Sequence, residues 1–333
     1  MDNNLKKPKV AIIFTGGTIS MTVDEEIGAA IPSLNGQDII SMVTNIDKLA
    51  DIEIIEYSEV PGPHVTFDML FDIKNIITDL SKRDDVTGVI VTHGTDTLEE
   101  TAYFLDLTLD IAKPVVMVGA MRNSSELGYD GPANLAAAVC TAISPKARDK
   151  GVLVVLNNEV NTALEVTKTN TLSLNTFQSR YGPIGIIDTN DLIIHRNITP
   201  RDHIDTDHIE KSVFLIKSYL DMDPRVIDFY LVENAKGLVI EAMGRGNLPP
   251  GFVPYLEKVI QKNIPVVIVS RCPSGRVMSS YGYEGGGKKL HDMGVIFGGE
   301  LSGQKAIIKL MLALSKSNDN NYIRSLFEGE YIY

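Results

Sequence analysis

Cysteine is scarce in this 333-residue sequence, and long apolar runs are missing from it. With only Cys140 and Cys272, and no Cys-x-x-Cys spacing, we expect no disulfide, no metal site and no cofactor. No run approaches the roughly 20 apolar residues of a membrane span. The apolar residues before Gly16 are too few for a secretory leader, so the sequence predicts a cytoplasmic protein without membrane contact.

Basic residues are outnumbered: 31 lysines and arginines face 43 acidic residues, for a net charge of −12. Nucleic acids and anionic membranes bind basic patches, so this balance argues against both as partners. The rest of the composition, 44% hydrophobic and 22% charged, is that of an ordinary globular protein. A length of 333 residues suits two domains or one large one.

Apolar runs alternate with helical patterns along the chain, which predicts an α/β fold with mostly parallel sheets flanked by helices. In the first part we expect strands at 10–14, 52–56, 88–92, 115–119 and 152–156, and helices at 37–45, 66–81, 97–109 and 132–143. A second alternation covers 213–217, 225–235, 237–243, 253–261 and 266–270, with a last helix at 304–314.

The stretch 195–208 is polar and has no apolar period. We therefore expect an N-terminal α/β domain over 1–194, a linker over 195–212, and a smaller C-terminal α/β domain over 213–333. His203 and His208 lie among aspartates in this stretch. Without a helix or strand to hold them, we interpret them as solvated linker residues and not as metal ligands.

Polar residues directly follow two of the predicted strands, where open α/β sheets bind their ligands. Residues 15–20 read TGGTIS, and residues 92–97 read THGTDT. Either threonine of the first motif can be a nucleophile if a base takes its proton, and Thr95 and Asp96 are the nearest suppliers in the pattern. The alternative for Thr95 or Asp96 is that it only caps the helix that follows. A phosphate-binding turn is disfavoured because neither Gly-Lys-Ser/Thr nor G-x-G-x-x-G is present.

The segment 20–36, between the first motif and the first helix, is polar and rich in small residues. A plain surface loop is one interpretation. Its position directly after Thr18 favours a second, in which it is a lid that gates the site.

The motifs "TGGTI" and "HGTDTLEETAYFL" together resemble the bacterial L-asparaginase and glutaminase-asparaginase family. The resemblance continues through "KPVVMVGAMR", "DGPANL", "GVLVV" and "VTKTNT", and resumes at "GRGNLP" and "SGQKA". It covers nearly the whole chain in the order of the family. It implies hydrolysis of the side-chain amide of L-asparagine to L-aspartate and ammonia, through a threonine nucleophile and an acyl-enzyme.

The resemblance also implies roles for single residues. Thr18 would be the acylated threonine, and Thr95, Asp96 and Lys168 would form the family's threonine–lysine–aspartate trio. The remaining implied contacts to substrate are Ser58 and Glu59 for its α-carboxylate and α-amino groups and Ala120 for its side-chain pocket. Amide hydrolysis also needs donors for the developing oxyanion, and the backbone N–H groups at Gly16–Thr18 and Gly94–Thr95 can supply them.

Two departures from the family pattern affect these roles. Most members carry a tyrosine in the lid, and 20–36 contains none, so Tyr283, or Tyr281 beside it, is our candidate for the missing phenol. Glu59 stands where many members have glutamine, and a carboxylate there favours the substrate ammonium.

In the family, active sites lie between subunits of homodimers or homotetramers. Asn247 and Glu284 match the second-domain residues that reach a neighbouring subunit.

Three other functions stay open beside asparagine hydrolysis. A glutaminase-asparaginase of broad specificity differs only in its preference between the two amides. An ammonia-releasing subunit of a tRNA-dependent amidotransferase is disfavoured, because the "TGGT" element begins within the first twenty residues. A protein that binds an amino acid without turnover would bind asparagine and release no ammonia.

Overall fold

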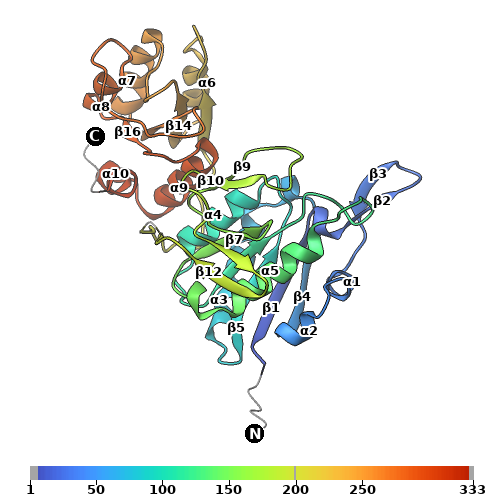
Figure 1. Ribbon diagram of the computed structural model, residues 1–333. Helices are drawn as coiled ribbons and strands as arrows, with labels where there is room; N and C mark the ends of the chain where they lie inside the picture. The colour runs from blue at the N-terminus through green and yellow to red at the C-terminus, as the bar shows by residue number, and fades with distance from the viewer. Residues whose placement is uncertain (1–6, 199, 330–333) are drawn as a thin grey trace. The chain divides into compact units, whose positions relative to one another are not determined.

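The computed structural model describes residues 7–198 and 200–329. The chain forms two compact units, Met1–His203 and Ile204–Tyr333, each of which has its own sheet (Figure 1). The division between the units falls within the polar segment 195–212. In the described residues, no helix is both long and apolar enough to cross a membrane.

An eight-stranded sheet in the order β12-β11-β8-β7-β6-β5-β1-β4 forms the centre of the first unit. Its strands are β1 (Lys9–Gly16), β4 (Asp51–Val60), β5 (Val86–Thr92), β6 (Val115–Val118), β7 (Val152–Leu156), β8 (Glu159–Thr162), β11 (Gly185–Asp188) and β12 (Asp191–Ile194). The five strands from β4 to β7 are parallel, while β8, β11 and β12 continue the sheet as antiparallel strands.

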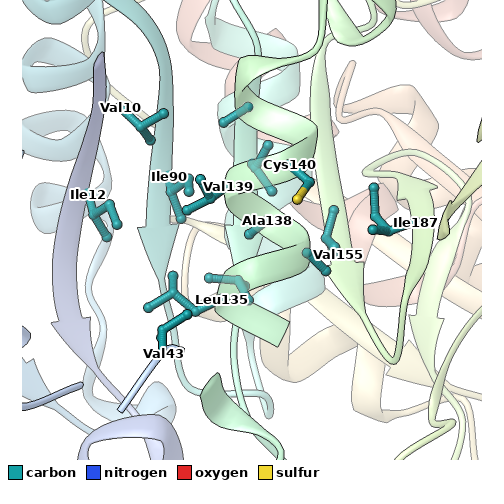
Figure 2. Close-up of a cluster of buried hydrophobic side chains, with 14 of the residues drawn as sticks. Val10, Ile12, Val43, Ile90, Leu135, Ala138, Val139, Cys140, Val155 and Ile187 are labelled. Atoms are coloured by element: carbon teal, nitrogen blue, oxygen red, sulfur yellow. The ribbon is translucent and has the colours of Figure 1, made fainter. Parts of the chain in front are cut away.

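Helices cover both faces of this sheet, so its central strands are buried on both sides. On one face lie α1 (Gly36–Ser41), α2 (Ile46–Leu49) and α5 (Gly131–Ile143), and on the other α3 (Phe67–Lys82) and α4 (Leu98–Thr108). Side chains alternate along a strand, so Val10 and Ile12 of β1 face the α5 cluster while Ala11 faces away, and all three are fully buried. Figure 2 shows α5 lying across the strands in this cluster, with Cys140 near Val155.

Four parallel strands in the order β13-β14-β15-β16 form the sheet of the second unit. These are β13 (Val213–Lys217), β14 (Gly237–Ala242), β15 (Val266–Ser270) and β16 (Ile296–Phe297). The helices are α6 (Val226–Val232), α7 (Val253–Gln261), α8 (Gly287–Asp292), α9 (Gly303–Lys316) and α10 (Asn320–Glu328). Ile240 of β14 packs with Phe252 and Leu256 in the core of this unit.

The predicted α/β class, with two mostly parallel sheets flanked by helices and the second one smaller, is confirmed. The expected loop at 20–36 is instead a β-hairpin of β2 (Met21–Asp24) and β3 (Ala29–Pro32). Its turn forms because Asp24 Oδ1 accepts hydrogen bonds from the N–H groups of Glu26 and Ile27. A second hairpin, β9 (Val166–Lys168) with β10 (Phe177–Ser179), was also not predicted. The 3₁₀ turns are η1 (Thr18–Ser20), η2 (Gly62–His64), η3 (Pro145–Ala147) and η4 (Pro250–Phe252).

Candidate active site

The carboxyl ends of three neighbouring parallel strands meet where the chain changes direction across the first sheet. From β1 the chain passes to β4 on one side, and it then returns to β5 on the other side of β1. Such a switch point leaves a crevice at the carboxyl ends of the strands, which is where α/β proteins bind ligands. Both polar motifs, residues 15–20 and 92–97, lie at this point.

The backbones of the two motifs pack directly against each other, Gly17 of the first against Gly94 of the second. This residue has φ 83° and ψ −177°, a conformation that side-chain-bearing residues rarely adopt. A Cβ atom on Gly17 would lie 2.5 Å from the Cα of Gly94, so no side chain fits there. The turn places Thr18 at the first position of η1, one residue after the contact between Gly17 and Gly94. The N–H of Gly17 donates to the carbonyl of Val60 at 3.1 Å. The expectation that backbone N–H groups of the two turns serve as oxyanion donors stays a prediction.

Thr15 and Thr18, the two candidate nucleophiles, differ in their surroundings. Thr15 is only 1% exposed, and its hydroxyl donates to the carbonyl of Thr92 at 2.6 Å. Its N–H donates to the Thr92 hydroxyl, and its carbonyl accepts from the Ser58 hydroxyl at 2.9 Å. Thr15 therefore ties β1 to its two neighbours. Thr18 is half-buried and follows the turn, which makes it the better candidate.

Thr95, Asp96 and Lys168 come together, although Lys168 is more than 70 residues away in the sequence. The Lys168 ammonium donates to Thr95 Oγ1 at 2.9 Å and to Asp96 Oδ1 at 2.8 Å. The Lys168 side chain is 16% exposed, while that of Asp96 is 65% exposed. A largely buried ammonium thus contacts a buried hydroxyl on one side and a hydrated carboxylate on the other, an arrangement suited to moving a proton.

The alternative that Thr95 or Asp96 caps the following helix is wrong. Helix α4 begins at Leu98 with Thr97 as its N-cap residue, whose side chain makes no capping hydrogen bond. The Thr97 hydroxyl instead donates to the carbonyl of Gly62 at 2.8 Å, which ties this turn to η2. Thr95 and Asp96 have no part in starting the helix, and their side chains meet Lys168.

The other predicted substrate contacts of the first unit lie around the same strand ends. Glu59, near the end of β4, is exposed, and Ser58 beside it is half-buried. Ala120 follows β6 and is fully buried in the α5 cluster, and Gly94 is buried against Gly62. Contacts of these four residues with a substrate stay predictions.

The predicted residues of the second unit also lie close together within that unit. Tyr281 and Tyr283 are 44% and 56% exposed, with ring centroids 5.7 Å apart. Glu284 pairs with Lys289 at 3.7 Å, and Asn247 Oδ1 accepts from the N–H of Gly287 at 3.1 Å. No group of three or more His, Cys, Asp or Glu side chains among the described residues is arranged to hold a metal ion.

His93 belongs to the second motif and stabilises its turn, although sequence reasoning assigned it no role. It is fully buried, its Nδ1 lies 2.8 Å from the carbonyl of Gly94, and its Nε2 lies 2.9 Å from the hydroxyl of Thr101. A carbonyl only accepts, so Nδ1 carries the proton and Nε2 accepts from Thr101. Burial lowers the pKa of His93 to about 4, which keeps the ring neutral. The neutral ring ties the Gly94 turn to α4.

Asp130 and Asn134 also support the site, and sequence reasoning assigned them no role. Asp130 accepts hydrogen bonds from the N–H groups of Met121 and Arg122 and from Asn134 Nδ2. Asn134 Nδ2 also lies 3.0 Å from the carbonyl of Gly119. Together they fix the turn around Ala120. The only signal in the sequence is the "DGPANL" motif, in which both residues stand.

Comparison with known proteins identifies matches along nearly all of the chain. Residues 9–200 match the family model "Asparaginase, N-terminal", and residues 212–327 match "Glutaminase/Asparaginase C-terminal domain". An L-asparaginase of Bacillus licheniformis is 34% identical, with 92% of this chain and 95% of that protein covered. A glutaminase-asparaginase of Acinetobacter glutaminasificans is 31% identical, with 96% and 99% covered. The crystal structure of a probable cytoplasmic L-asparaginase from Campylobacter jejuni superposes with a TM-score of 0.86 at 32% identity, covering 96% of this chain and 99% of that one.

Proposed function

The chain belongs to the asparaginase family, and from this premise we propose that it hydrolyses the side-chain amide of L-asparagine to L-aspartate and ammonia. The observation that carries the proposal is the contact of one ammonium, Lys168, with both Thr95 and Asp96 beside the Gly17 turn. Amide hydrolysis needs a nucleophile and a route for its proton, and the turn and the trio supply both.

In the first half-reaction, the Thr18 oxygen attacks the side-chain amide carbon. Its proton passes to Thr95 Oγ1 while the Thr95 proton passes to Lys168, whose ammonium has first given one proton to water, and the ammonium that forms again is stabilised by Asp96. Collapse of the tetrahedral intermediate breaks the C–N bond while the nitrogen takes the proton back from Lys168 through Thr95, so that ammonia leaves and Thr18 stays acylated. In the second half-reaction water attacks the acyl carbon, and the same trio receives its proton. Aspartate leaves and Thr18 regains its hydroxyl proton.

Recognition of the amino-acid part of the substrate is assigned to the end of β4. The exposed Glu59 carboxylate attracts the α-ammonium group of the substrate. A charge-assisted hydrogen bond to this carboxylate is stronger than the bond that a neutral glutamine amide would form. The Ser58 hydroxyl exchanges its bond to the Thr15 carbonyl for one to the substrate α-carboxylate. Ala120 limits the length of the side chain that fits.

We also propose that the enzyme is a cytoplasmic homodimer or homotetramer with its active sites between subunits. In that assembly Asn247 and Glu284 contact the substrate in a neighbouring site, and Tyr283 supplies the phenol that hairpin β2–β3 lacks. The cytoplasmic designation of the Campylobacter jejuni protein supports the location.

Ammonia release from L-asparagine and L-glutamine, measured side by side, tests the proposed function. We expect asparagine to be preferred. Equal turnover of the two amides below saturation would support a glutaminase-asparaginase of broad specificity instead, and asparagine binding without ammonia release would contradict an enzymatic function.

The nucleophile is tested by substitution. Thr18→Ala should remove nearly all turnover, because the covalent step loses its attacking oxygen. Thr15→Ser is the matched control, since it keeps the hydroxyl that bonds to Thr92. If Thr18→Ala kept more than a few per cent of the wild-type rate, a different residue would be the nucleophile.

A further inference from the structure

A loop from another part of the first unit lies along the segment that follows Thr18. This loop, residues 121–130, joins β6 to α5. Ser124 donates to the carbonyl of Met21 from its N–H at 3.1 Å and from its hydroxyl at 2.9 Å. The N–H of Val23 donates to the Ser125 hydroxyl at 3.0 Å. The start of hairpin β2–β3 is therefore held by residues about a hundred positions away in the sequence.

Tyr129, at the end of this loop, reaches closer to the nucleophile than the two serines do. Its hydroxyl donates to the carbonyl of Ile19 at 2.5 Å, and Ile19 directly follows Thr18 in η1. Ile19 is fully buried, so its carbonyl is shielded from water and needs a partner from the protein. Burial raises the pKa of Tyr129 well above its usual range, so the phenol stays protonated and keeps donating.

The ring of Tyr129 packs against Gly131, where the absence of a side chain leaves space for it. A Cβ atom on Gly131 would lie 2.5 Å from the Tyr129 ring, so even alanine would displace the ring. Asp130, between the two, holds the turn of Ala120 through the N–H groups of Met121 and Arg122. Consecutive residues thus support two separate parts of the site: Tyr129 supports the η1 turn and Asp130 supports the wall around Ala120.

We propose that Tyr129 is a positioning residue for the nucleophile: its hydroxyl, bonded to the Ile19 carbonyl, fixes the η1 turn and so the direction of the Thr18 side chain. The proposal rests on the proposed function of Thr18. Without the bond, the two ends of the turn stay tied to the domain, through Gly17 N–H to the carbonyl of Val60 and through the carbonyl of Ser20, which accepts from the N–H groups of Ser33 and Leu34. The carbonyl of Ile19, between these two ends, loses its hydrogen bond to the β6–α5 loop. The nucleophile then spends less time in the orientation for attack.

Tyr129→Phe tests this proposal, because it removes one oxygen and keeps the ring. We expect kcat for asparagine to fall about tenfold, the effect of one lost hydrogen bond, while KM stays within twofold. Amide hydrogen exchange in peptides covering residues 17–24 should become faster. Gly131→Ala should give the same pair of changes, because it displaces the phenol from the other side.

Ser125→Ala is the matched control, since it also breaks one hydrogen bond between the loop and the hairpin but leaves η1 untouched. It should keep kcat within twofold of the wild-type value. An equal loss in Ser125→Ala and Tyr129→Phe would assign the effect to the hairpin and overturn the role of Tyr129. Wild-type kcat or unchanged hydrogen exchange in Tyr129→Phe would also overturn it. If the wild-type protein released no ammonia, the proposed function would fail, and the exchange measurement would still decide whether Tyr129 fixes the turn.

Discussion

Replacing Lys168 by methionine should separate catalysis from stability. The substitution keeps the apolar stem and removes the ammonium that contacts Thr95 and Asp96. The proton route is interrupted, so we expect kcat to fall by about 10²- to 10⁴-fold, the usual contribution of a positioned acid–base group.

Stability should change little in the same variant. Asp96 is 65% exposed, so water replaces its partner, and an ion pair of this kind contributes about 0–1 kcal/mol. Loss of the bond to Thr95 adds about 1 kcal/mol. Urea unfolding should therefore show a decrease of no more than about 2 kcal/mol in the free energy of unfolding.

Lys146→Met is the matched control for this comparison. Lys146 is also in the first unit and contacts Asp191 at 3.1 Å and the carbonyl of Leu192 at 2.7 Å, far in the sequence from either motif. Its free energy of unfolding should fall by a similar amount, and its kcat should not change.

Lys168→Arg decides what the cation does. A guanidinium can still contact Asp96, but it does not lose its proton, so it cannot accept one from Thr95. We expect this variant to be as inactive as Lys168→Met. Wild-type kcat in Lys168→Arg would mean that a fixed positive charge is sufficient, and more than a tenth of wild-type kcat in Lys168→Met would refute the proton route.

Three further predictions concern the support of the site and the second unit. His93 has a pKa of about 4 in the folded protein and about 6.5 in the unfolded chain, so the unfolded chain binds more protons between these two pH values. The free energy of unfolding therefore falls by about 3 kcal/mol through this group as the pH drops from 7 to 4. Urea unfolding of His93→Gln should show a weaker pH dependence. Asp130→Ala should raise KM for asparagine several-fold and lower the free energy of unfolding by about 2–4 kcal/mol, because three donors lose a charged partner; KM at the wild-type value would contradict its support of Ala120. Tyr283→Phe should cut kcat by about 10²-fold at an unchanged melting temperature, and wild-type activity in both it and Tyr281→Phe would mean that the phenol comes from elsewhere.

Most long elements were predictable because their boundaries are marked in the sequence. The predicted segments 152–156, 213–217, 253–261 and 266–270 match β7, β13, α7 and β15 residue for residue. Each strand among them is a short apolar run next to glycine, proline or a polar turn, and the helix begins beside Pro250 and Pro254.

The missed elements include the helices α2, α8 and α10 and several short strands, whose pattern gives little periodicity. Strand β8 has four residues and β9 only three, and both mix polar with apolar side chains. One local signal did exist: Asn157 and Asn158, with φ 53° and 59°, form the two-residue turn between β7 and β8. Asparagine tolerates this conformation, so the pair marked a hairpin that was interpreted as the end of a strand.

The two motifs of the candidate site could be found from the sequence, but their partners could not. Strand-end glycines and threonines are local signals, whereas Lys168 lies 73 positions from Thr95 and Tyr129 lies 110 positions from Ile19. Nothing in the spacing relates such residues. The family resemblance supplied Lys168, and Tyr129 became visible only through its contact in the folded chain.

Three glycines, Gly17, Gly94 and Gly62, pack backbone against backbone at the candidate site, which limits how the enzyme can be changed by directed evolution. A Cβ atom on Gly94 would lie 2.5 Å from the Gly62 nitrogen, so neither Gly17 nor Gly94 has room for a methyl group. At the proposed substrate site the two turns therefore meet through peptide backbone alone, and randomising the codons of Gly17 and Gly94 would yield mainly misfolded clones. A library that aims at a new amide substrate should instead vary Glu59 and the exposed tip of hairpin β2–β3, where side chains can change without moving the chain beneath them.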